Sequence, residues 1–384
     1  MTAVPKADSL KPAKSSGAPY RADHVGSLLR PASIKAAHDK FAEGAISAEE
    51  VKAAEDEGIR GLVRMQEEVG LKVVTDGEAR REFWHYDFLR DLDGVEFVTR
   101  GADEGVAFHG VKIPPKFPTI TGRLDFPDEH PMIEHFKFLA ANTSVTPKIA
   151  IPGPSVAHYR TAKSDISYAP YRDVEVLFED LARTFAKATR KFYEAGCRYL
   201  QMDDIYFAYL GDPKQREMKR AEGLDPDWLI EKYAWMMHEA IKDRPADMLI
   251  GMHMCRGNFR STWAAEGGYD AAADAIFNQT GVDLFFMEYD NDRSGGLEPL
   301  RLLSKGKQRV YPGFITTKTG ALESLDLLKR QFEQASQYAD LDQLGIAPQC
   351  GFASTEHGNA ITEDDQKRKL ELVVQTAQAI WGEP

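Results

Sequence analysis

Cysteine, basic charge and long apolar runs are all scarce in this sequence. Three cysteines among 384 residues cannot form a disulfide framework without leaving one over, so we expect a reducing compartment, the cytoplasm. The 48 lysines and arginines are outnumbered by 60 acidic residues, and the net charge of -12 argues against a nucleic-acid-binding surface. No apolar run approaches the roughly 18 residues of a membrane helix. We therefore expect neither nucleic acid nor a membrane as a partner.

The beginning of the chain also lacks the apolar core of a signal peptide. Residues 1–19 are rich in proline, alanine, serine and lysine, which predicts a flexible tail. The rest of the chain contains no segment typical of a linker between domains. Because 43% of all residues are hydrophobic and 28% are charged, as in ordinary globular proteins, we expect one folded domain over residues 20–384.

What the sequence does contain is a regular alternation of apolar runs and helical patterns. This alternation predicts a parallel sheet covered by helices, and eight strands without a glycine-rich dinucleotide fingerprint favour a single (β/α)8 TIM barrel. Residues 95–126, where β-forming residues are broken by glycine and proline, predict a hairpin insertion after the second strand. The expected strands are residues 20–29, 73–79, 145–155, 197–204, 247–255, 283–290, 309–316 and 344–352. The expected helices are residues 31–43, 47–69, 131–141, 173–195, 224–243, 269–277, 297–304, 321–339 and 362–381.

Metal-ligand residues stand at the ends of three of these strands. His253 and Cys255 are one residue apart at the end of the run MLIGM, and side chains at i and i+2 of a strand point to the same side. Glu288 ends the run DLFFME, and Cys350 ends LGIAPQC. Histidine, thiolate and carboxylate together favour zinc over magnesium or calcium. We therefore predict one zinc ion bound by these four residues; the alternative is a buried core histidine with two buried thiols.

Further polar residues fall at the same ends of other strands. They are Ser27, Glu78, Asp203 and Lys318, the last just beyond the seventh strand. Barrel enzymes assemble their active sites at the C-terminal ends of the strands, so these residues are candidates for substrate binding and catalysis. A thiol bound to zinc loses its proton and becomes a nucleophile at neutral pH. This chemistry suits alkyl transfer to sulfur.

At this point the sequence resembles the cobalamin-independent methionine synthase family. The resemblance is closest to its short, single-barrel relatives within the uroporphyrinogen-decarboxylase-like superfamily. It covers residues 20–381 and is carried by DHVGSLLRP, VVTDGEARR, CRYLQMDD, GMHMCRGN, FMEYD, GFITTKTGALES and APQCGFAS. The resemblance implies that His253, Cys255, Glu288 and Cys350 bind zinc. It also implies that Glu78, Asp203 and the backbone around Ser27 hold the amino group and carboxylate of homocysteine, which is methylated to methionine.

The chain departs from the family pattern on the side of the methyl donor. It matches only the C-terminal catalytic barrel of the two-barrel enzyme. His158, Tyr159 and Arg160 occupy the region of the folate-stacking tryptophan, and Lys318 replaces the expected catalytic histidine. Three kinds of methyl donor are therefore compatible with the sequence. They are methyltetrahydrofolate, a methylated corrinoid that is either free or carried by a protein, and another small methyl donor. Lys318 is expected to hold an anionic part of the donor or to steady the leaving group.

The sequence allows two interpretations for some of the candidate site residues and for the function. Asp203 is expected in catalysis as well as in substrate binding, and His24 as a substrate contact or a satisfied strand histidine. Trp84 and His85 are expected to form a wall of the site rather than to catalyse. The competing functions are a zinc-dependent alkyl transfer to another thiol, such as coenzyme M with an epoxide, and a non-catalytic barrel stabilised by zinc. The carboxylates at Glu78 and Asp203 argue against coenzyme M, because a sulfonate requires arginine or lysine.

Overall fold

The structure is a computed structural model that describes residues 19–101, 107–108, 111–112, 116–306 and 308–384. The predicted flexible tail, residues 1–19, lies outside this part of the chain except for its last residue. None of the described helices is long and apolar enough to cross a membrane.

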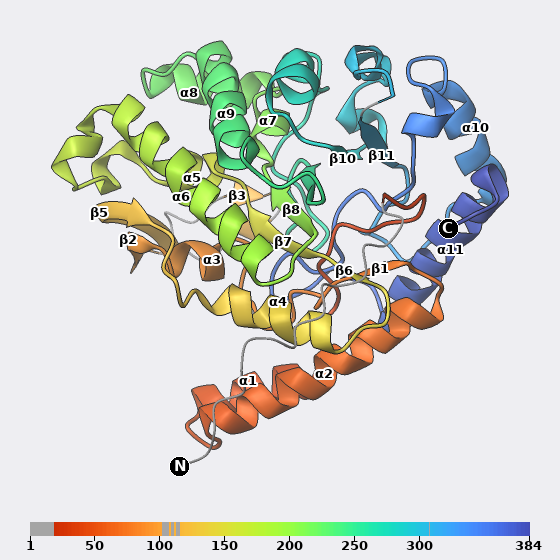
Figure 1. Cartoon of the computed structure of the whole chain (residues 1–384), viewed down its shortest axis with the longest axis horizontal. Coiled ribbons are helices and arrows are strands. Elements are labelled where there is room, and N and C mark those ends of the chain that lie inside the picture. Colours follow the sequence, from red (N-terminus) through yellow and green to blue (C-terminus); the bar gives the residue numbers. More distant parts are fainter. Residues whose placement is uncertain (1–18, 102–106, 109–110, 113–115, 307) are drawn as a thin grey trace.

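A parallel sheet of five strands, in the order β11-β10-β9-β8-β7, forms the largest part of the barrel wall (Figure 1). A short parallel pair, β1 with β6, precedes it, and single parallel bridges join Val310 to Leu344 and Ala22 to Ile346. The arrangement confirms the (β/α)8 prediction. The strands are β1 (Val73–Val74), β6 (Thr146–Pro147), β7 (Ile149–Pro152), β8 (Tyr199–Asp203), β9 (Leu249–Met254), β10 (Leu284–Glu288) and β11 (Arg309–Gly313).

Helices lie around these strands, as Figure 1 shows. Two of the long helices begin with reciprocal capping boxes, formed by Ser47 with Glu50 and by Thr362 with Asp365. The long helices are α1 (Ala32–Ala42), α2 (Ala48–Glu68), α4 (Pro131–Ala141), α6 (Val174–Glu194), α9 (Pro226–Ile241), α10 (Leu325–Ala335) and α11 (Glu363–Trp381). The shorter ones are α3 (Tyr86–Arg90), α5 (Ser155–Arg160), α7 (Tyr206–Tyr209) and α8 (Pro213–Ala221).

The first and last predicted strands are less regular than expected. Each forms isolated bridges instead of a continuous ladder. Side chains replace the missing backbone partners: Gln201 Nε2 donates to the Val25 carbonyl at 2.6 Å, and Thr75 Oγ1 to the Gly26 carbonyl at 2.6 Å. In the last strand, Pro348 has no N–H to donate to a ladder.

Two predicted helices are also reduced to single turns. Residues 269–277 were expected to be helical, but the structure has only η4 (Ala275–Gln279), a π-helical turn; for residues 297–304 it has η6 (Glu298–Leu302), a 3-10 helix. Gln308 Nε2 donates to the carbonyls of Phe277 and Val282, at 2.8 and 3.1 Å. This side chain therefore satisfies carbonyl groups in and just after η4.

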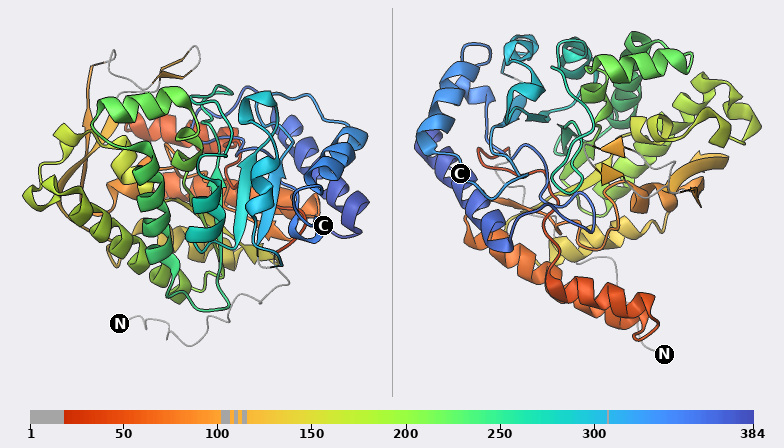
Figure 2. Two further views of the ribbon diagram at one scale, coloured as in Figure 1. Left: turned by 90° about the horizontal axis from the view of Figure 1, so that it is seen from above. Right: turned by 180° about the vertical axis from the view of Figure 1, so that it is seen from behind.

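The predicted insertion after the second strand is confirmed as antiparallel. β2 (Asp93–Thr99) pairs with β5 (Lys116–Asp125), and β3 (Ala107–Phe108) pairs with β4 (Val111–Lys112). Figure 2 shows this ribbon extending beyond the barrel strands. The insertion therefore reaches the same end of the barrel as the C-terminal ends of the strands, where Phe108 lines a pocket.

A buried ionic network fills the barrel interior below that pocket. Lys148 has no exposed side-chain surface, and its Nζ donates to Asp23 Oδ1 at 2.7 Å, to Gln201 Oε1 at 3.0 Å and to the His24 carbonyl. Tyr199 Oη donates to the second oxygen of Asp23 at 2.6 Å. Each charge in the network thus has a partner, which is the condition for burying charges without a large penalty.

Candidate active site

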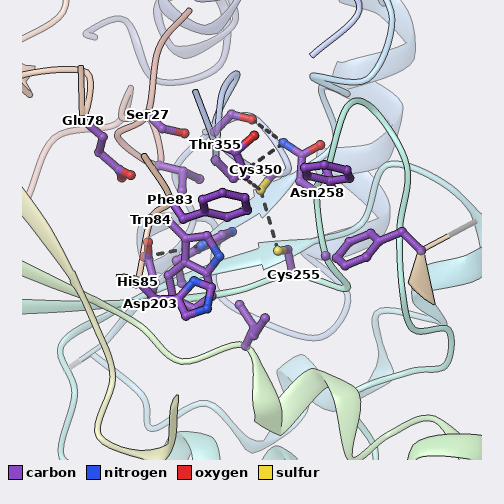
Figure 3. A pocket seen from close by; sticks show the side chains of 18 of the residues that line it. Ser27, Glu78, Phe83, Trp84, His85, Asp203, Cys255, Asn258, Cys350 and Thr355 are labelled. Atoms are coloured by element: carbon purple, nitrogen blue, oxygen red, sulfur yellow. Dashed lines mark hydrogen bonds and ion pairs between the residues drawn. The ribbon is translucent and has the colours of Figure 1, made fainter. Parts of the chain in front are cut away.

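A cavity opens at the C-terminal ends of the strands (Figure 3). Its walls come from segments far apart in the sequence: the strand ends, the turn after β1, α5, the loop after β9 and the hairpin insertion. Six of the residues predicted or implied for the site line it together. They are Ser27, Glu78, Asp203, His253, Cys255 and Cys350.

Three metal-ligand side chains converge at this cavity. The ligand atoms of His253, Cys255 and Cys350 all lie within 4.8 Å of one another. The two sulfur atoms are 3.6 Å apart, close to the edge of about 3.8 Å that a tetrahedron with Zn–S bonds of roughly 2.3 Å requires. His253 is buried, and neither of its ring nitrogens makes a well-formed hydrogen bond among the described residues; Nδ1 has a 3.4 Å contact with Asp203. This donor set therefore fits a bound metal ion.

Proton sharing in the cluster also fits a metal site. A hydrogen bond from Cys255 holds the pKa of the Cys350 thiol well below its usual range, and the same contact raises the pKa of Cys255. Burial lowers the pKa of His253, but contacts with Asp203 and Cys350 outweigh it and raise this pKa to about 10. These shifts favour loss of the proton from Cys350 over loss from Cys255 and favour the protonated form of His253. A metal ion can replace the protons of such a cluster when it binds.

Glu288 is placed differently from the other three predicted ligands. It ends β10 as expected and is fully buried, but its carboxylate is not part of the three-residue group. One oxygen accepts from the backbone N–H of Arg256 at 2.7 Å, and the other accepts from the Arg293 guanidinium. Burial opposes the ionised form, yet Lys318, Arg256 and Arg293 keep the pKa of Glu288 below its ordinary value. The carboxylate is therefore an anion held beside the cluster by cations.

Lys318 lies against the same cluster but outside the residues that line the cavity. Its side chain is 9% exposed, and Nζ has no hydrogen-bond partner among the described residues. The charge of Lys318 acts on Glu288 and on the thiol of Cys255, whose pKa values it lowers. The lysine is therefore a free positive charge close to the sulfur atoms.

Glu78 is held in a strained backbone conformation on the opposite side of the cavity. Its φ of 56° lies in the left-handed region, which costs a non-glycine residue roughly 1–2 kcal/mol. Gly77, with φ 68°, precedes it, and the Asp76 carboxylate accepts from the Glu78 N–H at 2.9 Å. Strain of this kind is concentrated at functional positions. The turn directs the carboxylate into the cavity, as Figure 3 shows.

Two carboxylates share this side of the cavity. Burial raises the pKa of Glu78 to about 7; Arg81, 3.4 Å away, opposes the shift, and the charge of Asp203 adds to it. Asp203 ends β8 and accepts from Gln201 Nε2 at 2.8 Å, while His253 Nδ1 lies 3.4 Å from it. Because the charge of Asp203 disfavours the ionised form of Glu78, the pair forms an environment suited to a cation such as a substrate ammonium group.

Ser27 lines the cavity, whereas His24 does not. A Cβ added at Gly351 would lie 1.8 Å from Ser27 Oγ, so only glycine permits this approach. His24 is buried next to Gln66 and Lys148, which face away from the cavity-lining set, and burial holds its pKa well below the ordinary value. The geometry therefore supports Ser27 but not His24 as a residue near substrate.

Aromatic residues form the rest of the wall. Phe83, Trp84 and His85 follow the Glu78 turn and line the cavity, as expected for the last two. Phe108 and Phe259, which were not foreseen as wall residues, complete a set of neighbouring rings; Phe83 and Phe259 lie nearly parallel with centroids 6.4 Å apart. The signal for Phe259 was its place directly after GMHMCRGN, whereas nothing local marked Phe108.

The chain is similar to several known proteins. The family model for the catalytic domain of cobalamin-independent synthase matches residues 21–378. YxjH of Bacillus subtilis, an uncharacterized protein, is 46% identical over 375 residues, 97% of each chain. The solved structure of a candidate vitamin-B12-independent methionine synthase from Listeria monocytogenes has a TM-score of 0.75 and 40% identity, covering 95% of this chain and 99% of that one.

A longer relative shows what part of the two-barrel enzymes is present. The 5-methyltetrahydropteroyltriglutamate–homocysteine methyltransferase of Flavobacterium johnsoniae is 24% identical over 353 residues, which are 91% of this chain but 41% of that protein. The match to the family model and the 46% identity to a full-length relative decide the assignment. The chain belongs to the cobalamin-independent methionine synthase family and is a methyltransferase of that family.

Proposed function

We propose that this protein is a zinc-dependent S-methyltransferase that converts homocysteine to methionine. The observation that carries the proposal is one cavity holding a thiol–imidazole cluster beside two buried carboxylates. The cluster suits a thiol that must be activated, and the carboxylates suit an ammonium group on the same substrate. The family assignment supports the same acceptor, since a relative of this chain is named as a homocysteine methyltransferase.

In this proposal His253, Cys255 and Cys350 would hold a zinc ion, and the chemistry that it would supply is a lowered pKa of the homocysteine thiol and so a nucleophilic sulfur at neutral pH. Glu288 is the fourth predicted ligand. Its ion pair with Arg293 holds the carboxylate beside the three-residue cluster but outside it. A carboxylate that already has cationic partners is easily replaced by an incoming thiol. We therefore assign Glu288 as the exchangeable ligand.

The substrate is oriented by the opposite wall. Glu78 and Asp203 accept hydrogen bonds from the ammonium group, and the backbone around Ser27 faces the carboxylate. Gln201 fixes the orientation of Asp203 through its 2.8 Å hydrogen bond. With both ends of the amino acid held, the sulfur lies next to the cluster, and fixing the reactants in this way accounts for a large part of catalysis.

The reaction exchanges the thiol proton and the methyl group, so it breaks the S–H and methyl–donor bonds and forms the S–methyl and donor–H bonds. The sulfur electron pair attacks the methyl carbon, the bond between the methyl group and the donor breaks, and its electron pair stays on the donor. The thiol proton ends on the donor's leaving atom, so that a thiol and a methylated donor give a thioether and a protonated donor. Lys318, as a free positive charge near the sulfur atoms, stabilises the negative charge that develops on the leaving group.

The proposal also concerns the identity of the methyl donor. Methyltetrahydrofolate and other small methyl donors remain open, and the comparisons give no support to a corrinoid protein partner. Because the chain corresponds to 41% of a two-barrel relative, we propose that polyglutamylated methyltetrahydrofolate is a poor donor. Methionine formation from mono- and polyglutamylated methyltetrahydrofolate, methylcobalamin and S-methylmethionine would rank the donors.

The acceptor is tested by X-ray absorption at the zinc edge. We expect one zinc per chain in protein purified without chelator, and one additional sulfur in the metal's coordination shell after homocysteine is added. Addition of a sulfur from coenzyme M but not from homocysteine would transfer the proposal to the other thiol. Protein without zinc, or a shell that neither thiol changes, would contradict the proposal and favour a structural metal or none.

A further inference from the structure

One arginine in the cavity wall has no ionic partner. Arg160 is the last residue of α5 and lines the same cavity as Cys255 and Cys350. No described carboxylate forms an ion pair with it, and its Nε is buried without a hydrogen-bond partner among the described residues. Arg81 and Arg256, which are also buried, are bound to Glu78 and to backbone carbonyls respectively.

The groups around Arg160 are unpartnered as well. Its guanidinium lies 5.8 Å from the centroid of the Tyr206 ring. The hydroxyls of Tyr206 and Tyr209 and both ring nitrogens of His85 are buried without hydrogen-bond partners in the described part of the chain. Burial and the nearby charge of Arg160 hold the pKa of His85 well below its ordinary value, so the imidazole is neutral. Polar groups without a well-formed hydrogen bond among the described residues are thus concentrated in one corner, where Arg160 also contacts the Tyr206 hydroxyl.

This corner is separate from the carboxylate side. Burial opposes the charge of Arg160, and a contact with the Tyr206 hydroxyl supports it; neither Glu78 nor Asp203 is among the groups that shift its pKa most. The position of α5 is fixed from below, because the Asp204 carboxylate accepts from the Ser155 hydroxyl. The cavity therefore has an anionic side for one ligand and a cationic, aromatic side for another.

We propose that Arg160, together with the hydroxyl of Tyr209, binds an oxyanion of the methyl donor. The donor then carries a carboxylate or phosphate close to its reacting methyl group, next to a flat apolar body that packs on Phe83 and Phe108. A guanidinium pairs with both kinds of oxyanion through two parallel hydrogen bonds. The identification of this ligand as the methyl donor rests on the proposed function; the oxyanion site itself does not.

Three small probes test the site without knowledge of the donor. Benzoate, phenyl phosphate and benzamide share one flat ring and differ in the presence and type of charge. We expect calorimetry on the metal-loaded protein to show at least tenfold tighter binding of one or both anions than of benzamide. Arg160→Gln should remove the difference and Arg160→Lys should keep part of it, while Arg190→Gln, an exposed arginine on α6, should leave it unchanged. Circular dichroism would verify that the variants fold.

Homocysteine separates this inference from the proposed function. Its affinity should be the same in Arg160→Gln as in the wild type, and saturating benzoate should leave it unchanged. Equal affinities for benzoate and benzamide, or a preference for anions that persists in Arg160→Gln, would overturn the site. Competition between benzoate and homocysteine would overturn its assignment to the donor. Absence of homocysteine binding would contradict only the proposed function, because the three probes would still report on Arg160.

Discussion

The barrel contains two buried polar clusters that differ in how completely their polar groups are hydrogen-bonded. In the lower cluster, Lys148, Asp23 and Tyr199 bind one another and Gln201, and Nζ of the lysine has three partners. In the upper cluster, around His253 and the two cysteines, Lys318 Nζ and Arg160 Nε have no hydrogen-bond partner among the described residues.

This difference in hydrogen bonding distinguishes a cluster that stabilises the fold from one that binds a ligand. Buried polar groups are normally hydrogen-bonded, and an unpaired one costs free energy. A cluster that is fully paired can be explained by the fold alone, whereas a cluster with several unpaired groups requires a ligand to explain it. Gln201 belongs to both, since it accepts from Lys148 and donates to Asp203. The lower cluster therefore also orients the upper one.

Breaking the lower cluster should have the largest effect on stability. Lys148→Met leaves Asp23 buried without its cation, and we expect the free energy of unfolding to fall by about 3 to 5 kcal/mol. Urea unfolding followed by circular dichroism measures this. The matched control is Lys187→Met, which removes a 2.9 Å pair with Asp125 that is partly exposed and should cost about 0–1 kcal/mol. Equal losses in both variants would show that the paired cluster contributes little.

Removing a thiol from the upper cluster should act on metal affinity rather than on folding. Loss of residues behind a metal ligand costs roughly 10- to 100-fold in affinity, so Cys255→Ala or Cys350→Ala should lose more than about 100-fold. Competition with a chromophoric chelator measures the affinity. Cys197→Ala is the control, because this third thiol is buried and donates to the Tyr199 carbonyl outside the cavity. Full retention of metal by a Cys255 and Cys350 double variant would refute the metal site.

The carboxylate side should control the affinity for the amino acid. A hydrogen bond to a charged group contributes roughly 1.5–3 kcal/mol, so Glu78→Gln or Asp203→Asn should weaken homocysteine binding by about ten- to a hundredfold. Calorimetric titration measures the change. Glu82→Gln, a partly exposed neighbour that pairs with Lys116, should bind homocysteine normally. If both pocket variants bind like the wild type, the ammonium site is elsewhere.

The pH dependence of binding gives the smallest expected effect. Burial first, and then the charge of Asp203, raise the pKa of Glu78 to about 7 against the opposing charges of Arg81 and Arg30. An ammonium group requires the ionised carboxylate, so this contribution to affinity is lost as pH falls through about 7. Between pH 6 and 8 it should amount to about tenfold. We expect Glu78→Gln to lose this part of the pH profile while it keeps the part due to the thiol; identical profiles would contradict the assignment.

Much of the fold could be predicted because its signals are local. The capping residue Ser47 marked the start of α2, and Pro131 and the apolar spacing after it gave α4 with the observed bounds. The first and last strands and the helices expected at residues 269–277 and 297–304 were less accurate, because side chains such as Gln201 and Gln308 donate to backbone carbonyls there. No local pattern indicates such a distant partner.

The site likewise has parts that could be predicted from the sequence and parts that could not. His253, Cys255 and Cys350 follow from the sequence because parallel strands bring their C-terminal ends to one face. Glu288 had the right chemistry and position in the strand, yet its pairing with Arg293 places the carboxylate outside the three-residue group. The insertion was recognised as a hairpin, but its contribution of Phe108 to the cavity depends on how it folds back over the barrel.

The sequence by itself therefore determined the alternation of strands and helices, the family, and the set of donor atoms at the strand ends. Periodicity, caps and strand ends are properties of neighbouring residues, so they can be read along the chain. Only the tertiary structure decided which buried charges are paired and which are free. Lys148 meets Asp23 across 125 positions, while Arg160 meets no described carboxylate. Pairing depends on distances between residues that are remote in sequence, and these distances exist only once the barrel has formed.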